Sequence, residues 1–279
     1  MTLRYLLVHL DKGESSAVRA DVAISLAKRF GARLTALYAV CDPDVPSLAS
    51  RNRYVFVERA AGKAEAAFRL HAAASGVEVD WLADVGASDI QVSRAVVLRA
   101  READLVILGQ FKPSDADGSV PPTLVDHTVL HSGRPVLVVP HSGSFPHVWR
   151  RVVIAWNNSR EATRAVHDAL PLLGASDEAT VLALRPSPSP RDADGTLDQL
   201  ADGLVRHLVE HGVKAVADRL LFDPNSIEPA ERLLSYLADT KADVLVIGAP
   251  GQLSGRAAAK RSLTRHVLEQ MTIPVLLSY

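Results

Sequence analysis

The chain has 279 residues, of which 48% are hydrophobic and 23% are charged, values typical of a globular protein long enough to form two domains. Lys plus Arg total 31 and Asp plus Glu total 32, so no overall charge field attracts the chain to nucleic acid or to an anionic membrane. Cys41 is the only cysteine, which excludes an intrachain disulfide and a cysteine-rich metal site.

The hydropathy of the chain favours a cytoplasmic protein. The apolar run within the opening residues, MTLRYLLVHLDKGE, is too short for the apolar region of a signal peptide. No stretch approaches the ~18 apolar residues that a membrane-spanning helix needs. We therefore expect a protein of the reducing cytoplasm with no membrane partner.

Apolar runs alternate with helical patterns along the first half, which predicts helices on both faces of a parallel, doubly wound sheet. The expected strands are residues 5–10, 34–40, 77–83, 105–108 and 136–139. Ser15 or Ser16 is expected to cap the first helix and Ser88 the third. The buried face of the first helix is predicted from a four-residue spacing of Val18, Val22, Leu26 and Phe30. Gly31 and Gly133 are expected just after helices.

A turn-rich linker at residues 141–147 precedes a second half with the same order of elements. Its later strands are expected at residues 180–184, 216–221, 244–247 and 275–277. Ser159 is expected to cap its first helix and Ser226 a later one. Pro171 is expected to end or kink the first of these helices.

Three motifs occur twice along the chain. RYLLVHLD at residues 4–11 corresponds to RVVIAWN at 151–157, ADLVILG at 103–109 to ADVLVIG at 242–248, and RPVLVVP at 134–140 to IPVLLSY at 273–279. The last two pairs share an offset of 139 residues, which chance seldom gives over separate motifs. We infer two homologous five-stranded α/β domains in tandem, residues 1–140 and 149–279.

Ligands of such sheets bind beyond the carboxyl ends of the strands, where the strand order reverses. The residues at these ends are Asp11 and Gly109 in the first half, and Asn157 and Gly248 in the second. After Gly248 come Gly251, a polar stretch and a helical pattern. This order lets backbone N–H groups and a helix N-terminus converge on an anion, although an ordinary strand-to-helix connection has the same pattern.

The strand–Asp–Gly–Ser opening, the strand–glycine signature and the final Pro-Val-Leu-Val strand together resemble a tandem universal stress protein, over essentially the whole chain. This family has the adenine-nucleotide alpha-hydrolase type of fold. Its nucleotide loop reads G-x2-G-x9-G-[S/T], and three of these four positions match in this chain. The four positions are occupied by Gly248, Gly251, Arg261 and Ser262.

The resemblance implies a nucleotide site in the second half. Gly248 and Gly251 would admit the phosphates, Ser262 would donate to them, and the main chain around Leu184 would meet the adenine edge. Asn157 stands where nucleotide-binding members have an Asp, and loss of that buried hydrogen bond would weaken the site by ~1–3 kcal/mol. Arg261 stands where the family has glycine, so it either crowds the phosphates or donates to them.

The first half departs further from the family pattern. It keeps Asp11 and Gly109 but lacks a second glycine three residues later. Pro122 and Thr123 align with the Gly-[S/T] pair, and proline has no N–H to offer. We interpret this half as a degenerate site that keeps the fold. The alternative is that neither half binds a nucleotide.

Other groups of residues that could bind a metal ion give weaker signals. His127 and His131, and likewise His207 and His211, lie four apart on expected helices, a spacing that can hold a metal. Neither pair has an evident third ligand, so solvated histidines are favoured and no metal is expected. The acidic stretch with Asp115 and Asp117 lacks the remaining ligand spacing of a calcium loop.

The resemblance implies a cytoplasmic stress-response protein that binds ATP or a related adenine nucleotide, with or without Mg, in its C-terminal domain. No catalytic residue is expected: no general base is evident, so any hydrolysis should be slow. The alternatives are an interaction module with both pockets closed and, last, an adenylyl-transferring ligase. Family members also imply a pseudo-two-fold pairing of the domains through residues 136–139 and 275–277, with a homodimer as a further prospect.

Overall fold

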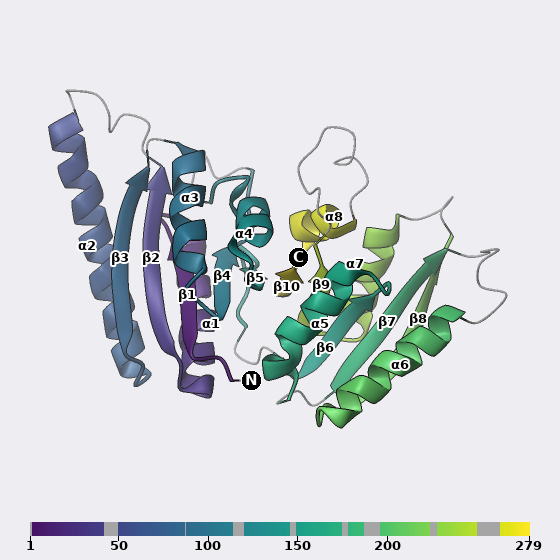
Figure 1. The fold of residues 1–279 in the computed structure, drawn as a ribbon. Coiled ribbons are helices and arrows are strands. Elements are labelled where there is room, and N and C mark those ends of the chain that lie inside the picture. Colours follow the sequence, from purple (N-terminus) through teal and green to yellow (C-terminus); the bar gives the residue numbers. More distant parts are fainter. Residues whose placement is uncertain are drawn as a thin grey trace. The chain divides into compact units, whose positions relative to one another are not determined.

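The computed structural model describes residues 2–41, 50–86, 88–113, 120–145, 149–174, 178–186, 196–223, 228–249 and 263–279. The chain divides into two compact units, Thr2–Pro146 and His147–Tyr279 (Figure 1). We call them the first unit and the second unit. Each contains a five-stranded sheet with helices on both faces.

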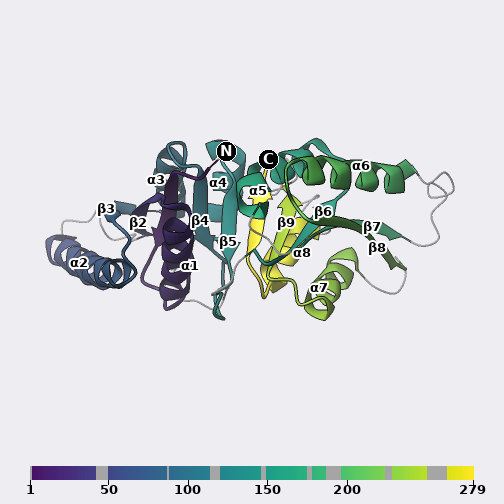
Figure 2. The same ribbon diagram turned by 90° about the horizontal axis from the view of Figure 1, so that it is seen from below.

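Strands and helices alternate in the first unit. Its elements are β1 (Tyr5–Leu10), α1 (Ser15–Phe30), β2 (Arg33–Cys41), α2 (Ser50–Ala74), β3 (Val79–Gly86), α3 (Asp89–Ala100), β4 (Leu105–Gly109), α4 (Leu124–Ser132) and β5 (Val136–Val139). The strands are parallel and lie in the order β3-β2-β1-β4-β5. Helices α1 and α2 lie on one face of this sheet, and α3 and α4 on the other (Figure 2).

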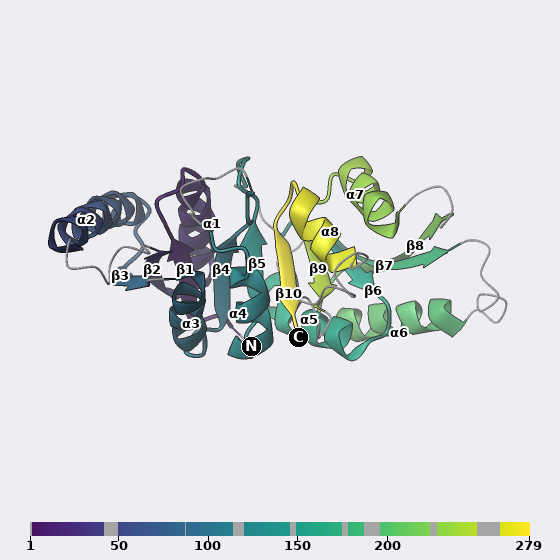
Figure 3. The same ribbon diagram turned by 90° about the horizontal axis from the view of Figure 1, so that it is seen from above.

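The second unit repeats this plan. Its elements are β6 (Arg151–Trp156), α5 (Arg160–Leu173), β7 (Glu178–Pro186), α6 (Thr196–Glu210), β8 (Ala215–Phe222), α7 (Pro229–Asp239), β9 (Val244–Gly248), α8 (Leu263–Gln270) and β10 (Val275–Ser278). Its parallel strands lie in the order β8-β7-β6-β9-β10. Helices α5 and α6 cover one face, and α7 and α8 the other (Figure 3). The predicted fold class is confirmed.

Strands β4, β5 and β9 are continuous apolar runs because helices exclude water from both faces of the sheet. Every residue of β4 and β5 is buried, and the first four residues of β9 are buried as well. Burial of this kind contributes about 25 cal/mol per Å² of apolar surface. These buried strands therefore hold the strand ends of each sheet in fixed positions.

The repeated Ala-Asp motif before β4 and β9 has a structural role. The carboxylate of Asp104 accepts hydrogen bonds from the backbone N–H groups of Arg4 and Tyr5, at 2.7 and 3.0 Å. Asp243 does the same for Arg150 and Arg151. Because both motifs satisfy the first N–H groups of the neighbouring strand, the sequence repeat is matched by a repeated set of contacts.

One expectation about helix ends is wrong, and one is settled only in part. Neither Ser15 nor Ser16 caps α1: its N-cap is Glu14, which makes no side-chain cap, because the hydroxyl of Ser16 hydrogen bonds with Asp11 instead. Pro171 lies inside α5 and does not end it, since the helix runs on to Leu173; a kink at this residue stays a prediction. Its missing N–H cannot donate to the carbonyl of His167, one turn earlier in the helix.

Other expectations about the helices are confirmed in whole or part. Ser88 caps α3 and Ser159 caps α5 through their side chains. Gly31 ends α1 in the left-handed region, with φ of 58°, a conformation that glycine adopts without steric cost. On α1, Val22 and Leu26 are buried, whereas Val18 and Phe30 are only half-buried. Ser226 lies outside the described residues.

Candidate functional site

Each unit has one point where the strand order reverses. In the first unit it lies between β1 and β4, and in the second between β6 and β9, because the chain adds β2 and β3 (or β7 and β8) on one side before it crosses to the other. The carboxyl ends of these strands are where ligands bind in doubly wound sheets. The residues that follow them therefore define the two candidate sites.

In the first unit Asp11 lies at the centre of a buried hydrogen-bond network. One carboxylate oxygen, Oδ1, accepts from the backbone N–H of Gly13 at 2.7 Å and from the hydroxyl of Ser16 at 2.9 Å. The other, Oδ2, accepts from Nη2 of Arg19 at 2.5 Å, and both side chains of this ion pair are fully buried. The network ties the end of β1 to the first two turns of α1.

Arg19 fills the space above Gly109. A Cβ atom placed on Gly109 would collide with the Arg19 guanidinium, whose Nη1 would be its nearest neighbour. Among the described residues, Nε and Nη1 of Arg19 have no hydrogen-bond partner. The structure thus links Asp11 and Gly109 through Arg19, an arginine of the protein itself.

Burial controls the ionisation of the groups around Arg19. The ring of His9 is fully buried, with Nε2 2.8 Å from the carbonyl oxygen of Ala39 and Nδ1 4.0 Å from Asp11 Oδ2. Burial lowers the pKa of His9 from 6.5 to about 4, so the ring is neutral at pH 7. Burial would raise the pKa of Asp11, but Arg19 and the N–H of Gly13 outweigh it and hold that pKa below its usual value.

One other departure of the first unit, Gln110, also faces inward. Gln110 is buried, and its Oε1 accepts hydrogen bonds from the backbone N–H of His141 at 3.1 Å and from the His141 ring at 2.6 Å. Thr123 is the N-cap residue of α4 but makes no side-chain cap. Gln110 is therefore engaged with the segment after β5 rather than held free for a ligand.

Register places three predicted residues of the second unit at one edge. Trp156 pairs with Ala183 across β6 and β7, so the next residues, Asn157 and Leu184, are neighbours where β6 ends. On the other side of β6, Ala155 pairs with Ile247, which brings Gly248 to the same edge. Asn157 itself is exposed, and its Oδ1 accepts from the N–H of Ser159 at 3.1 Å.

Gly248 packs against the first turn of α5. A Cβ atom at this position would lie 2.5 Å from the backbone nitrogen of Ala162 and 2.5 Å from the carbonyl carbon of Glu161. Because both are backbone atoms, they cannot swing aside. The glycine therefore lets the N-terminus of α5 approach the end of β9, a role distinct from direct approach to phosphate.

The two units differ at one buried position of their first helix. Arg19 lies eight residues after Asp11, and Ala165 lies eight residues after Asn157. Both side chains are buried. A charged guanidinium in the first unit thus corresponds to a single methyl group in the second.

The remaining predicted site residues, Gly251, Arg261 and Ser262, lie outside the described residues. Asp115 and Asp117 lie outside them too. The helix α8 begins at Leu263, directly after Ser262 in the sequence. The nucleotide roles assigned to these residues stay predictions.

The histidine pairs have different surroundings. The rings of His127 and His131 on α4 lie 5.6 Å apart. On α6 the ring of His207 lies 4.6 Å from that of His211 and 5.5 Å from that of His167 on α5. Burial and the two neighbouring rings lower the pKa of His207. Among the described residues, no group of three or more His, Cys, Asp or Glu could hold a metal ion.

Sequence reasoning missed Arg19, the residue that most changes the first site. Charged residues are almost never fully buried unless they are paired, so the sequence alone does not indicate that Arg19 belongs to the core. The spacing along the helix could have indicated its burial, because Ala23 and Leu26 follow Arg19 by four and seven residues and lie on the buried face of α1.

In the described part of the chain, no helix is long and apolar enough to cross a bilayer. No curated protein matches the sequence. Among solved structures, a universal stress protein from Archaeoglobus fulgidus DSM 4304 has 15% identity and a TM-score of 0.72, over 99% of this chain and 96% of that chain. A putative universal stress protein from Pseudomonas aeruginosa UCBPP-PA14 has 16% identity and a TM-score of 0.60, over 99% and 93%.

A universal stress protein solved in complex with cAMP matches 51% of this chain and 100% of its own, with 23% identity and a TM-score of 0.36. The model of the family described as "Universal stress protein family" matches the chain twice, at residues 3–140 and 149–278. These matches cover both units and nearly every residue. The chain therefore belongs to the universal stress protein family, with two copies of the family domain in tandem.

Proposed function

We propose that this protein binds ATP or a related adenine nucleotide, with or without Mg, in its second unit, while its first unit is closed by its own arginine. The observation that carries the proposal is the contrast between Arg19 and Ala165. The Arg19 guanidinium lies over Gly109, where a ligand of a doubly wound sheet would approach the strand ends. The equivalent position of the second unit holds only a methyl group.

The second unit offers the kinds of group that a nucleotide needs. The N-terminus of α5 lies against the end of β9, and helix N-termini favour anions such as phosphates. The main chain of β7 beyond Ala183 has no pairing residue in β6, which supports the proposal that the main chain around Leu184 meets a base edge. The retained family positions Gly248, Gly251 and Ser262 supply the rest of the proposed site.

We further propose that the nucleotide acts as a signal and is not turned over rapidly. The residue that follows β6 is Asn157, whose amide has no useful basicity and cannot take a proton from an attacking water. The loss of a carboxylate here also weakens nucleotide binding by ~1–3 kcal/mol.

The test is calorimetric titration of the purified protein with Mg-ATP. Wild type should bind about one nucleotide per chain, and Gly251→Val should abolish binding because the side chain blocks the loop. The matched control is Lys112→Val, at the position of the first half that aligns with Gly251. Gly248 is unsuitable for this test because any side chain there meets α5. Absence of binding by wild type, or loss of binding in the control alone, would refute the proposal.

A second candidate function is an interaction module with both sites closed. It is favoured by the close approach of α5 to Gly248, which fills part of the space at the strand ends. This alternative predicts no heat with Mg-ATP and no effect of Gly251→Val. The cytoplasmic location, the pseudo-two-fold pairing of the domains and a homodimer stay predictions, the last testable by light scattering of the eluted protein.

A further inference from the structure

Trp156, the last residue of β6, carries a polar atom that the protein itself does not use. Its Nε1 is buried and has no hydrogen-bond partner among the described residues. The residue as a whole is only half-buried, so part of the ring reaches the surface where β6 ends. A buried indole N–H usually has a partner, because a buried donor without an acceptor costs free energy. This donor is therefore available to a ligand at the strand ends.

The strand pairing places the indole at the candidate site of the second unit. Trp156 pairs with Ala183 of β7. On its other side it is level with Gly248 of β9, because Ala155 pairs with Ile247. Side chains at paired positions point to the same face of a sheet. The indole therefore points to the face that α5 covers, since a Cβ atom on Gly248 would meet the first turn of that helix.

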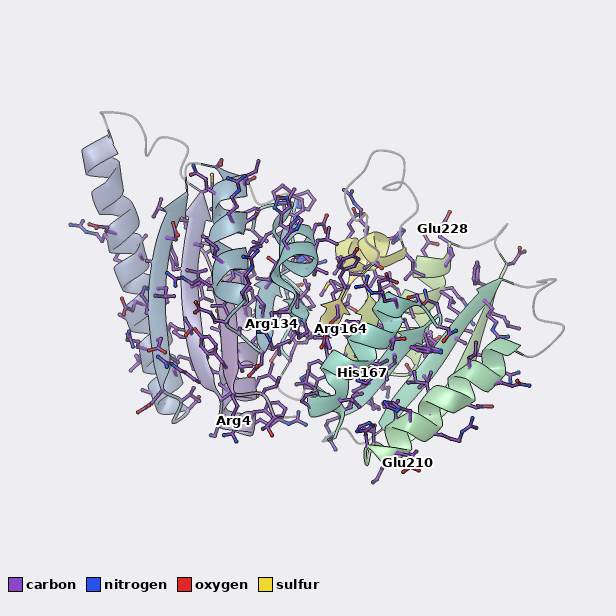
Figure 4. All side chains as sticks on the ribbon, viewed as in Figure 1. Arg4, Arg134, Arg164, His167, Glu210 and Glu228 are labelled. Carbon is purple, nitrogen blue, oxygen red and sulfur yellow. The ribbon has the colours of Figure 1, made fainter. Side chains whose placement is uncertain are left out.

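The neighbouring side chains explain why the indole N–H has no partner. The two residues beside it in the sheet are an alanine and a glycine, which have no side-chain acceptor. On α5 the exposed Arg164 and His167 mark the outer face of the helix (Figure 4). The buried residues of α5 are all apolar: Ala162, Ala165, Val166, Ala169, Leu172 and Leu173.

The first unit lacks this donor. The last residue of β1 is the apolar Leu10, and the Arg19 guanidinium fills the space above Gly109. In the second unit the corresponding strand ends in Trp156, and α5 has only the methyl group of Ala165 at the position of the arginine. We propose that the indole N–H of Trp156 donates a hydrogen bond to an oxygen of the bound nucleotide and so sets the affinity of the second unit. This inference rests on the proposed function.

The bond is favourable because the N–H has already lost its contact with water. In most binding sites a donor must be desolvated when the ligand arrives, and this cost cancels much of the new hydrogen bond. The Nε1 of Trp156 is buried before the ligand binds, so that cost is already part of the folded protein. The Cβ–Cγ torsion of tryptophan is broad, which lets the half-buried ring turn its N–H towards the strand ends. Such a bond should raise the affinity about 5- to 10-fold.

The test replaces Trp156 by 3-benzothienylalanine, an isostere in which sulfur takes the place of the N–H. Wild type and variant are titrated with Mg-ATP in a calorimeter, and the variant should bind about 5- to 10-fold more weakly. Urea unfolding without nucleotide should give an unchanged or higher midpoint, because the variant no longer buries a donor without an acceptor. A purely structural role of the N–H would instead lower the midpoint.

Trp149 provides the matched control. Its Nε1 is also buried without a partner among the described residues, but it lies before β6, at the opposite end of the strand from Trp156. The same replacement there should leave the affinity unchanged. Absence of Mg-ATP binding by wild type would overturn the proposed function and this inference with it. Three results would overturn the role of Trp156 alone: wild-type affinity in its variant, a lower urea midpoint of that variant, or an equal loss of affinity in the Trp149 variant.

Discussion

The buried ion pair between Asp11 and Arg19 should dominate the stability of the first unit. Asp11→Asn removes the carboxylate that neutralises the fully buried guanidinium and weakens its shortest hydrogen bond. Removal of one partner of a buried pair costs about 3–5 kcal/mol, because the other charge is left without compensation in a medium of low polarity. We therefore expect Asp11→Asn to destabilise the first unit by about that amount.

An exposed ion pair of the same unit provides the control. Arg33 and Asp80 also form a short contact, but their side chains are 70% and 45% exposed. Water screens such a pair, so Asp80→Asn should cost less than about 1 kcal/mol. The double variant Asp11→Asn/Arg19→Met removes both buried charges, and it should recover more than about 1 kcal/mol relative to Asp11→Asn alone.

The assay is urea unfolding of the full chain followed by hydrogen exchange of individual peptides, which reports the two units separately. Peptides of the first unit should lose protection at lower urea in Asp11→Asn, and peptides of the second unit should not change. Equal stability of Asp11→Asn and Asp80→Asn would refute the reasoning, because it would mean that the Arg19 charge is not buried in solution.

Two further predictions concern pH and packing. The folded pKa of His9, about 4, lies below its value of 6.5 in the unfolded chain. The unfolded state therefore takes up a proton first as pH falls, and the free energy of unfolding should drop by about 3 kcal/mol between about pH 6.5 and 4. His9→Gln keeps a donor for Ala39 and should flatten this drop in urea unfolding, whereas equal pH dependence in both proteins would contradict the assignment. Gly248→Ala should destabilise the second unit by about 1–3 kcal/mol because its Cβ meets backbone. Gly203→Ala in α6, where a Cβ has room, should stabilise the unit by up to about 1 kcal/mol. Comparison of the two urea midpoints checks this, and equal midpoints would rule out the steric role.

The fold could be predicted because its signals are local and repeated. Buried strands such as β4 and β5 read as continuous apolar runs, and the offset of 139 residues between ADLVILG and ADVLVIG reveals the tandem domains. The parallel order follows from the alternation of strands and helices. None of these inferences needs a long-range contact between particular side chains.

The side-chain arrangement at the two candidate sites was less predictable, because it depends on contacts between residues of different elements. Serine is a common N-cap residue, so the sequence favoured Ser16 as a helix cap, but its hydroxyl hydrogen bonds with Asp11 instead. Arginine is usually a surface residue, but the ion pair with Asp11 allows Arg19 to be buried. In the same way His167, which is 40 residues away in sequence from His207, joins it only through the packing of the second unit.

Hydrogen exchange with and without Mg-ATP tests the asymmetry of the two units most directly. The account predicts slower exchange in peptides that contain the carboxyl ends of β6 and β9, around Asn157 and Gly248, and no change in peptides that contain Asp11 and Gly109. Protection around Asp11 and Gly109, or no protection in either unit, would contradict the claim that Arg19 closes the first site and that the second binds the nucleotide.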